Sequence, residues 1–232
     1  MTHVLVPVAV LKGSTVSGGL IDLLGTLNVT LLGYHVVPEQ TPPDQARAQF
    51  EERATNALGN IAEEFRVAGG DAYYRMVFTG NRRKTIERVA AEIGVDAYAI
   101  TGVTGAVESL LVPLSGEIAV SRIVGFVTTL IGDRDIVVTL LAAGNVPESR
   151  HDEAATTLET AGVQTETRVS AAGPFDALVD AMPGHDAVVV GEAAPSLSSF
   201  LFGEKSNRAA AAFVGPVLVV RRNQPETDTV HS

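Results

Sequence analysis

Short apolar runs alternate with longer amphipathic stretches in the first part of the chain. Apolar runs bounded by turn residues are typical of buried parallel strands. They predict strands at residues 3–9, 29–37, 72–79 and 96–101. Between these runs, apolar residues recur at helical spacing. This spacing predicts one helix capped by Ser14, a long helix that starts at Thr41 before two prolines, and a third helix around Ile86–Ile93.

The same alternation starts again near residue 110. The apolar runs predict strands at residues 110–114, 135–142, 186–190 and 216–220, and a further strand is predicted at residues 164–170. The amphipathic stretches predict helices at residues 119–130, 148–161, 174–182 and 206–213. The second series therefore continues one helix and one strand further than the first.

The restart has the features of an internal repeat. Thr30-Leu31-Leu32 recurs 109 residues later as Thr139-Leu140-Leu141, and Val37-Pro38-Glu39 recurs at the same offset as Val146-Pro147-Glu148. Further on, Asp96-Ala97 matches Asp186-Ala187, and Gly102 matches Gly191. Matches that keep their order along the whole series indicate a duplicated unit.

Alternating strands and helices with short connections predict an α/β fold, with parallel sheets covered by helices on both faces. We expect two doubly wound sheets, one for each copy. The predicted units are residues 1–107, which lack the last helix and strand, and residues 108–222. A flexible tail follows at residues 223–232.

The ordered fragments resemble the universal stress protein family. The resemblance rests on VLVPV at 4–8 and LLVPL at 110–114 as first strands, TLLGYHVVPE at 30–39, DAVVVG at 186–191 and GPVLVVR at 215–221. It implies a Rossmann-like, adenine-nucleotide alpha hydrolase-like sheet of five parallel strands. Many members of the family bind ATP at the carboxyl ends of the first and fourth strands, where the strand order of an open α/β sheet reverses.

The family's nucleotide signature is eroded in the second copy. The resemblance implies an Asp after the first strand, but Ala9 and Ser115 stand there. It also implies Gly-x-x-Gly, nine residues and then Gly before a hydroxyl residue. Gly191 fits the first glycine, but Ala194 replaces the second. Gly203 is one residue early for the third, and Glu204 replaces the hydroxyl residue, where it would repel a phosphate.

In the first copy, Gly102-Val103-Thr104-Gly105 matches the start of the signature but leads directly into the next strand. Three interpretations therefore stay open: ATP binding, binding of another small molecule or of a nucleotide in an altered pose, and no ligand at all. The residues expected to line the sites are Ala9, Gly102, Ser115, Gly116, Gly191, Gly203, Lys205 and Ser206.

The composition excludes several kinds of partner and site. The formal net charge is −10, and 17 basic residues face 27 acidic ones, so nucleic acid is not an expected partner. The acidic, lysine-poor surface fits an ordinary cytoplasmic protein or a salt-adapted one. The chain has no cysteine, which excludes disulfides, thiolate metal sites and cysteine nucleophiles. We see no signal peptide, and the longest apolar stretch is too short to span a bilayer.

No catalytic constellation emerges, so a non-enzymatic sensing or regulatory module is expected, and the alternative is a slow ATPase or phosphotransferase. Gly203-Glu204-Lys205-Ser206 lacks P-loop spacing. His35 is interpreted as structural or as a ligand contact, and His151 and His185 are expected at the surface. Leu197–Phe202 would be core, a lid or a partner patch. The resemblance implies a homodimer paired through residues 216–220, and a membrane-transporter partner is a further possibility.

Overall fold

The computed structural model describes residues 1–37, 43–114, 120–144, 146–192 and 213–222. The strands are β1 (His3–Val8), β2 (Asn28–Val36), β3 (Asp71–Thr79), β4 (Ala97–Ile100), β5 (Ser109–Leu114), β6 (Val137–Ala143), β7 (Thr165–Ser170), β8 (Ala187–Gly191) and β9 (Val217–Val220). The helices are α1 (Gly18–Leu24), α2 (Pro43–Val67), α3 (Arg82–Glu92), α4 (Val120–Ile131), α5 (Glu148–Thr160) and α6 (Pro174–Ala181), with a 3-10 turn, η1, at Val10–Lys12. The tail and the predicted helix at 206–213, except its last residue, lie outside the described residues.

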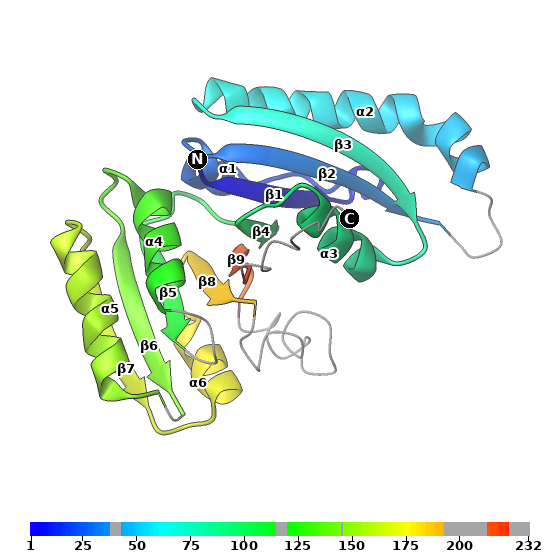
Figure 1. Ribbon diagram of the computed structural model, residues 1–232. Coiled ribbons are helices and arrows are strands. Elements are labelled where there is room, and N and C mark those ends of the chain that lie inside the picture. Colours follow the sequence, from blue (N-terminus) through cyan, green and yellow to red (C-terminus); the bar gives the residue numbers. More distant parts are fainter. Residues whose placement is uncertain (38–42, 115–119, 145, 193–212, 223–232) are drawn as a thin grey trace, which may run out of the picture.

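The strands form one mostly parallel, nine-stranded sheet in the order β3-β2-β1-β4-β9-β8-β5-β6-β7 (Figure 1). The sequence predicts two sheets, and β9 joins them into one. On one side β9 pairs in parallel with β8, and on the other it pairs antiparallel with β4. The strands β1–β4 therefore run opposite to β5–β9, and the carboxyl ends of the two sets lie on opposite edges of the sheet.

Both edges of β9 are hydrogen-bonded within the chain. Val217 lies opposite Val188 of β8 and opposite Ile100 of β4. The pairing that was expected between chains through residues 216–220 is thus made inside one chain. A homodimer, which stays a prediction, would have to use another surface.

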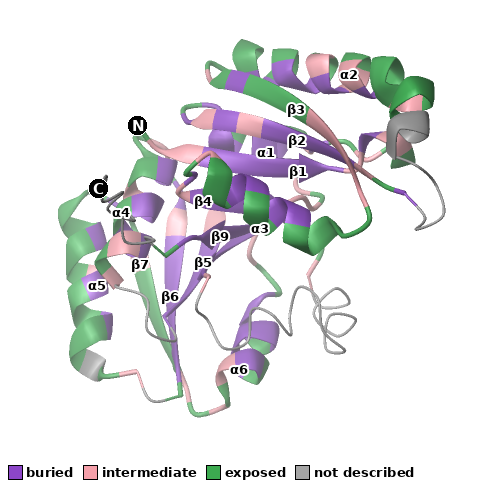
Figure 2. Ribbon diagram, turned by 45° about the vertical axis from the view of Figure 1, so that its right-hand side comes forward, coloured by how far each residue is buried: buried purple, intermediate pink, exposed green. Residues whose placement is uncertain are grey.

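Helices cover both faces of the sheet (Figure 2). Buried side chains of α1, α2, α4 and α5 join one hydrophobic cluster, and those of α3 and α6 join a second cluster on the other face. The two halves of the chain therefore contribute equivalent helices to the same face. This mostly parallel, helix-covered sheet is a Rossmann-like α/β fold.

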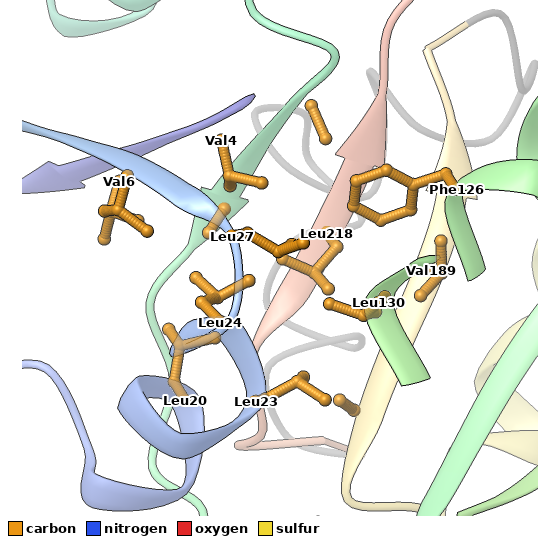
Figure 3. Close-up of a cluster of buried hydrophobic side chains, with 14 of the residues drawn as sticks. Val4, Val6, Leu20, Leu23, Leu24, Leu27, Phe126, Leu130, Val189 and Leu218 are labelled. Carbon is orange, nitrogen blue, oxygen red and sulfur yellow. The ribbon is translucent and has the colours of Figure 1, made fainter. Parts of the chain in front are cut away.

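The larger cluster continues across the junction between the halves. Leu24 of α1 and Leu130 of α4 lie near Leu218 of the shared strand, and all three are fully buried (Figure 3). Burying one such leucine contributes about 1.5–3 kcal/mol to the stability of a fold. The two halves therefore share one core on this face.

The first helix starts later than the sequence predicts. Ser14 was expected to cap it, but the N-cap is Ser17, and η1 occupies the preceding residues. Gly13 has a φ of 73° and ends the 3-10 turn in the left-handed conformation, which glycine adopts without steric cost. The predicted cap at Ser14 is therefore wrong, because the chain turns once more before α1 begins.

Asp96 and Asp186, which match in sequence, have the same structural role in the two halves. One carboxylate oxygen of Asp96 accepts the backbone N–H of His3, the first residue of β1, at 3.0 Å. One oxygen of Asp186 accepts the N–H of Ser109, the first residue of β5, at 3.0 Å. Each carboxylate satisfies a strand-end donor that the ladder leaves unpaired.

Candidate functional site

Each half has a point where the strand order reverses, and such points hold ligands in open α/β sheets. In the first half it lies between β1 and β4, and in the second between β5 and β8. Because the halves run in opposite directions, the two points lie on opposite edges of the sheet. Of the residues expected from the sequence, the structure describes Ala9, Gly102 and Gly191, and these three fall on the two edges.

In the first half, the residues expected at the site lie close together but leave no open space for a ligand. Val4 pairs with Ala97 and Leu5 with Tyr98, and continuing this register sets Ala9 level with Gly102. Ala9 belongs to the start of the 3-10 turn, where its carbonyl accepts the N–H of Lys12 at 2.9 Å. The strand ends are thus adjacent, as predicted.

Gly102 is tightly packed against the chain itself. A β-carbon at this position would overlap the backbone of Val214 and Gly215, which precedes β9. The neighbouring N–H of Val103 donates to the carbonyl of Val214 at 2.7 Å. The glycine that resembles a phosphate-binding residue therefore allows close contact with the segment that leads into the shared strand.

Gly105, the last residue of the motif, closes over the start of α1. A β-carbon on Gly19 would overlap the carbonyl oxygen of Gly105 and would also touch the methyl group of Thr104. The loop between β4 and β5 thus lies against the first turn of α1. In the first half, the chain's own backbone contacts both glycines of the motif.

In the second half, the structure describes only part of the expected site. Gly191 is buried at the carboxyl end of β8, where it pairs with Val220 of β9. Ser115, Gly116, Gly203, Lys205 and Ser206 lie outside the described residues, as does the apolar stretch Leu197–Phe202. The position of Gly191 agrees with its predicted place at the end of the fourth strand of this half.

An ion pair that the sequence analysis missed lies beside Gly191. The carboxylate of Glu192 lies 3.7 Å from the Arg221 guanidinium and accepts the N–H of Arg222 at 3.1 Å. Arg221 is only 9% exposed, and it donates to the carbonyl of Ala90 at 2.8 Å. A cation there complements the carboxyl end of α3. The signal was present as the final Arg of the GPVLVVR motif.

Burial and charge act together on Tyr98, on the adjacent strand β4. Burial of the side chain, reinforced by the carboxylates of Glu192 and Glu87, raises the pKa of Tyr98 to about 12. Its phenol therefore stays neutral at physiological pH. It provides no general base at this edge of the sheet.

The Asp residues at the strand starts lie on the opposite side from these ligand edges within each half. Burial alone would raise the pKa of Asp186, but hydrogen bonds from the Ser109 hydroxyl and from the N–H groups of Glu108 and Ser109 hold it below its usual value. Burial lowers the pKa of His3, and the charge of Asp96 partly opposes that effect. These groups have structural partners.

The other histidines in the described part of the chain have structural contacts. The His35 ring lies between Phe50 and Phe78, with centroid distances of 5.6 and 6.1 Å. His151 was expected at the surface but is only 5% exposed, because α5 packs it toward the carbonyl of Leu140 at 3.4 Å. His185 is also not a free surface group, since its ring contacts the Thr139 hydroxyl at 2.9 Å. Both surface expectations are corrected by the packing of their elements.

Among the described residues, no three His, Asp or Glu side chains are grouped so that they would hold a metal ion. None of the helices described is both long and apolar enough to cross a bilayer.

Comparisons with known proteins identify the fold. No protein-family model and no curated protein sequence matches the chain. Among solved structures, it is similar to a universal stress protein from Archaeoglobus fulgidus DSM 4304, with a TM-score of 0.64 and 12% identity over 96% of this chain and 97% of that one. A second universal stress protein from Archaeoglobus fulgidus aligns with 48% of this chain and 92% of its own, with a TM-score of 0.35 and 16% identity. The Rossmann-like sheet described above is therefore the universal stress protein fold.

Proposed function

We propose that the chain is a non-enzymatic binding and regulatory module of the universal stress protein type. Residues 1–107 and 108–222 would be two copies of one unit, and only the second would offer a small-molecule site. The observation that carries this proposal is the packing of Gly102 against Val214 and Gly215, because it places backbone where the first unit would receive a ligand.

The duplication is supported by equivalent contacts in the two halves. The strand order β3-β2-β1-β4 in the first half corresponds to β7-β6-β5-β8 in the second. Asp96 and Asp186, which match in sequence, each accept at 3.0 Å the backbone N–H of the residue that starts the first strand of their half, His3 and Ser109 respectively. Such equivalent positions favour a duplicated unit in which β9 serves as the fifth strand of both copies.

The ligand is proposed to be a small molecule that binds near Gly191. An adenine nucleotide is the first candidate, because the chain shares its fold with universal stress proteins and resembles that family, many of whose members bind ATP. Ser115 in place of the expected Asp and Glu204 in place of the expected hydroxyl argue for weak or altered nucleotide binding. They also argue against turnover, since metal-assisted phosphate transfer needs a carboxylate placed to hold the cation.

The first experiment is mass spectrometry of small molecules extracted from freshly purified, unheated protein, in low and in molar salt. It is followed by thermal unfolding with ATP and Mg²⁺, because a ligand that binds the folded state raises the melting temperature by mass action. A nucleotide recovered near one per chain, or a saturable rise in melting temperature, supports the proposal. An empty extract together with no thermal response contradicts it.

Two variants locate the site. Gly191→Val should abolish the response, because its side chain would stand at the strand end where the ligand is expected. Gly80→Val is the matched control, since a β-carbon at this exposed glycine meets nothing within 4 Å. A response that survives Gly191→Val places the ligand elsewhere. Phosphate release from magnesium ATP that Gly191→Val abolishes would replace the non-enzymatic proposal with the slow ATPase.

A further inference from the structure

A crevice lies where the two halves meet, and Val220 in its wall is the strand partner of Gly191. It has a volume of about 250 Å³, and its walls come from both halves. Thr2 and Asp96 line it from the first half, and Arg122 and Phe126 of α4 and Val220 of β9 line it from the second. The crevice therefore exists only because β9 joins the halves.

Two opposite charges stand side by side in its wall. One guanidinium nitrogen of Arg122 lies 3.5 Å from a carboxylate oxygen of Asp96. The Nε of Arg122 donates to the carbonyl of Arg221 at 2.6 Å, and the other oxygen of Asp96 accepts the N–H of His3. These backbone bonds hold both charged groups in place.

Both groups keep hydrogen-bonding capacity beyond these contacts. A guanidinium has five N–H donors, and the described contacts of Arg122 use two nitrogens once each. A carboxylate has about four acceptor positions, and the described contacts of Asp96 occupy one on each oxygen. Their side chains are 27% and 41% exposed, so a small solute can reach both.

We propose that this crevice binds a small zwitterion of the amino-acid or betaine class. Its carboxylate would pair with Arg122 and its ammonium group with Asp96, while its carbon skeleton would lie on Phe126 and Val220. A simple anion would be repelled by Asp96, and a simple cation by Arg122. The volume equals about eight water molecules, which suits a compact metabolite and excludes a nucleotide.

Binding there would tighten the junction. Asp96 precedes β4 of the first half, whereas Arg122 belongs to the first turn of α4 in the second. A ligand held by both charges stabilises the joined arrangement and raises the melting temperature. This site shares no lining residue with those expected for the nucleotide site near Gly191, and it adjoins that site through the pairing of Val220 with Gly191.

Gly125 offers a way to fill the crevice without removing a charge. It is an exposed lining residue of α4, and a β-carbon there meets nothing within 4 Å. Gly125→Leu should therefore fold, and should become more stable because leucine favours a helix more than glycine does. Gly59→Leu in α2 is the matched control, since a β-carbon at that helical glycine also meets nothing within 4 Å.

The test is a nuclear magnetic resonance titration of the full chain with glycine and glycine betaine. Acetate and glycinamide serve as singly charged comparisons. We expect saturable shifts at the Arg122 and Asp96 signals with at least one zwitterion, weaker binding of both comparisons, and affinity reduced at least about tenfold in Gly125→Leu but not in Gly59→Leu. The absence of saturation with either zwitterion overturns the proposal. Equal binding of acetate, or binding that persists in Gly125→Leu, overturns it as well.

Discussion

The carbonyl oxygen of Gly105 lies against Gly19, in the space where any other residue would carry its β-carbon. Gly105 belongs to the loop between β4 and β5, and Gly19 to the first turn of α1. The loop that connects the halves thus closes over the helix that follows β1. It does so because Gly19 has no side chain, whereas a β-carbon on Gly105 would meet nothing within 4 Å.

Gly19→Ala tests this contact. The new methyl group must displace the backbone of the loop, and overpacking of this kind costs about 1–3 kcal/mol. Gly18→Ala is a neighbouring control, because a β-carbon there meets nothing within 4 Å and alanine favours the helix. Urea unfolding should show a lower free energy of unfolding for Gly19→Ala and an unchanged or higher one for Gly18→Ala. Equal effects of the two substitutions would contradict the contact.

Arg221→Met tests the tie between β9 and α3. The substitution keeps an unbranched apolar stem in the buried space but removes the donor to the carbonyl of Ala90 and the partner of Glu192. The carbonyl of Ala90 also accepts the N–H of Val95 at 3.2 Å, so the variant loses one hydrogen bond from a charged donor, which contributes about 1.5–3 kcal/mol. The exposed neighbour Arg222 provides the control substitution Arg222→Met. If both variants unfold at the same urea concentration as the unsubstituted protein, Arg221 does not stabilise the junction.

The sequence predicts the strands well because buried parallel strands appear in it as continuous apolar runs. The run at 110–114 becomes β5, and the run at 216–220 becomes β9. No comparable sequence pattern identifies the strand that pairs with β9. A strand that is apolar on both faces pairs equally well in either direction, so its antiparallel match with β4 depends on where the whole second half docks.

The sequence likewise predicts the candidate site only in part. A glycine that approaches phosphate and a glycine that approaches backbone both need the same thing, the absence of a β-carbon. The sequence therefore places Gly102 correctly at a strand end but does not reveal that Val214 and Gly215 lie against it. Arg221 was missed for a related reason: its partner carbonyl at Ala90 is 131 residues away.

The lowered pKa of Asp186 predicts how stability depends on pH. A carboxylate whose pKa is lower in the folded state than the unfolded value of 3.8 stabilises the fold above that value. This contribution is lost as the pH falls through the folded pKa. Asp186→Asn should therefore reduce the free energy of unfolding at neutral pH, and the difference should shrink below about pH 4. Asp133→Asn, at an exposed turn, is the control. A difference that stays constant with pH would show that the charge of Asp186 contributes nothing.

Tyr98 predicts a change at the alkaline end. Its pKa is about 12 in the folded chain against 10.0 for a free tyrosine, so folding favours the neutral phenol. That stabilisation is complete below the unfolded pKa and is lost as the pH rises through the folded value. Each pKa unit of difference corresponds to about 1.4 kcal/mol, so Tyr98 accounts for a loss of stability at alkaline pH on the order of 2–3 kcal/mol.

Absorbance of the phenolate should show one of the four tyrosines titrating last, and Tyr98→Phe should remove that step and reduce the alkaline loss of stability. Tyr73→Phe, whose parent side chain is 67% exposed, should leave both unchanged. If Tyr73→Phe removed the late titration step instead, the tyrosine with the raised pKa would be Tyr73 and not Tyr98, which lies near Glu192 and Arg221.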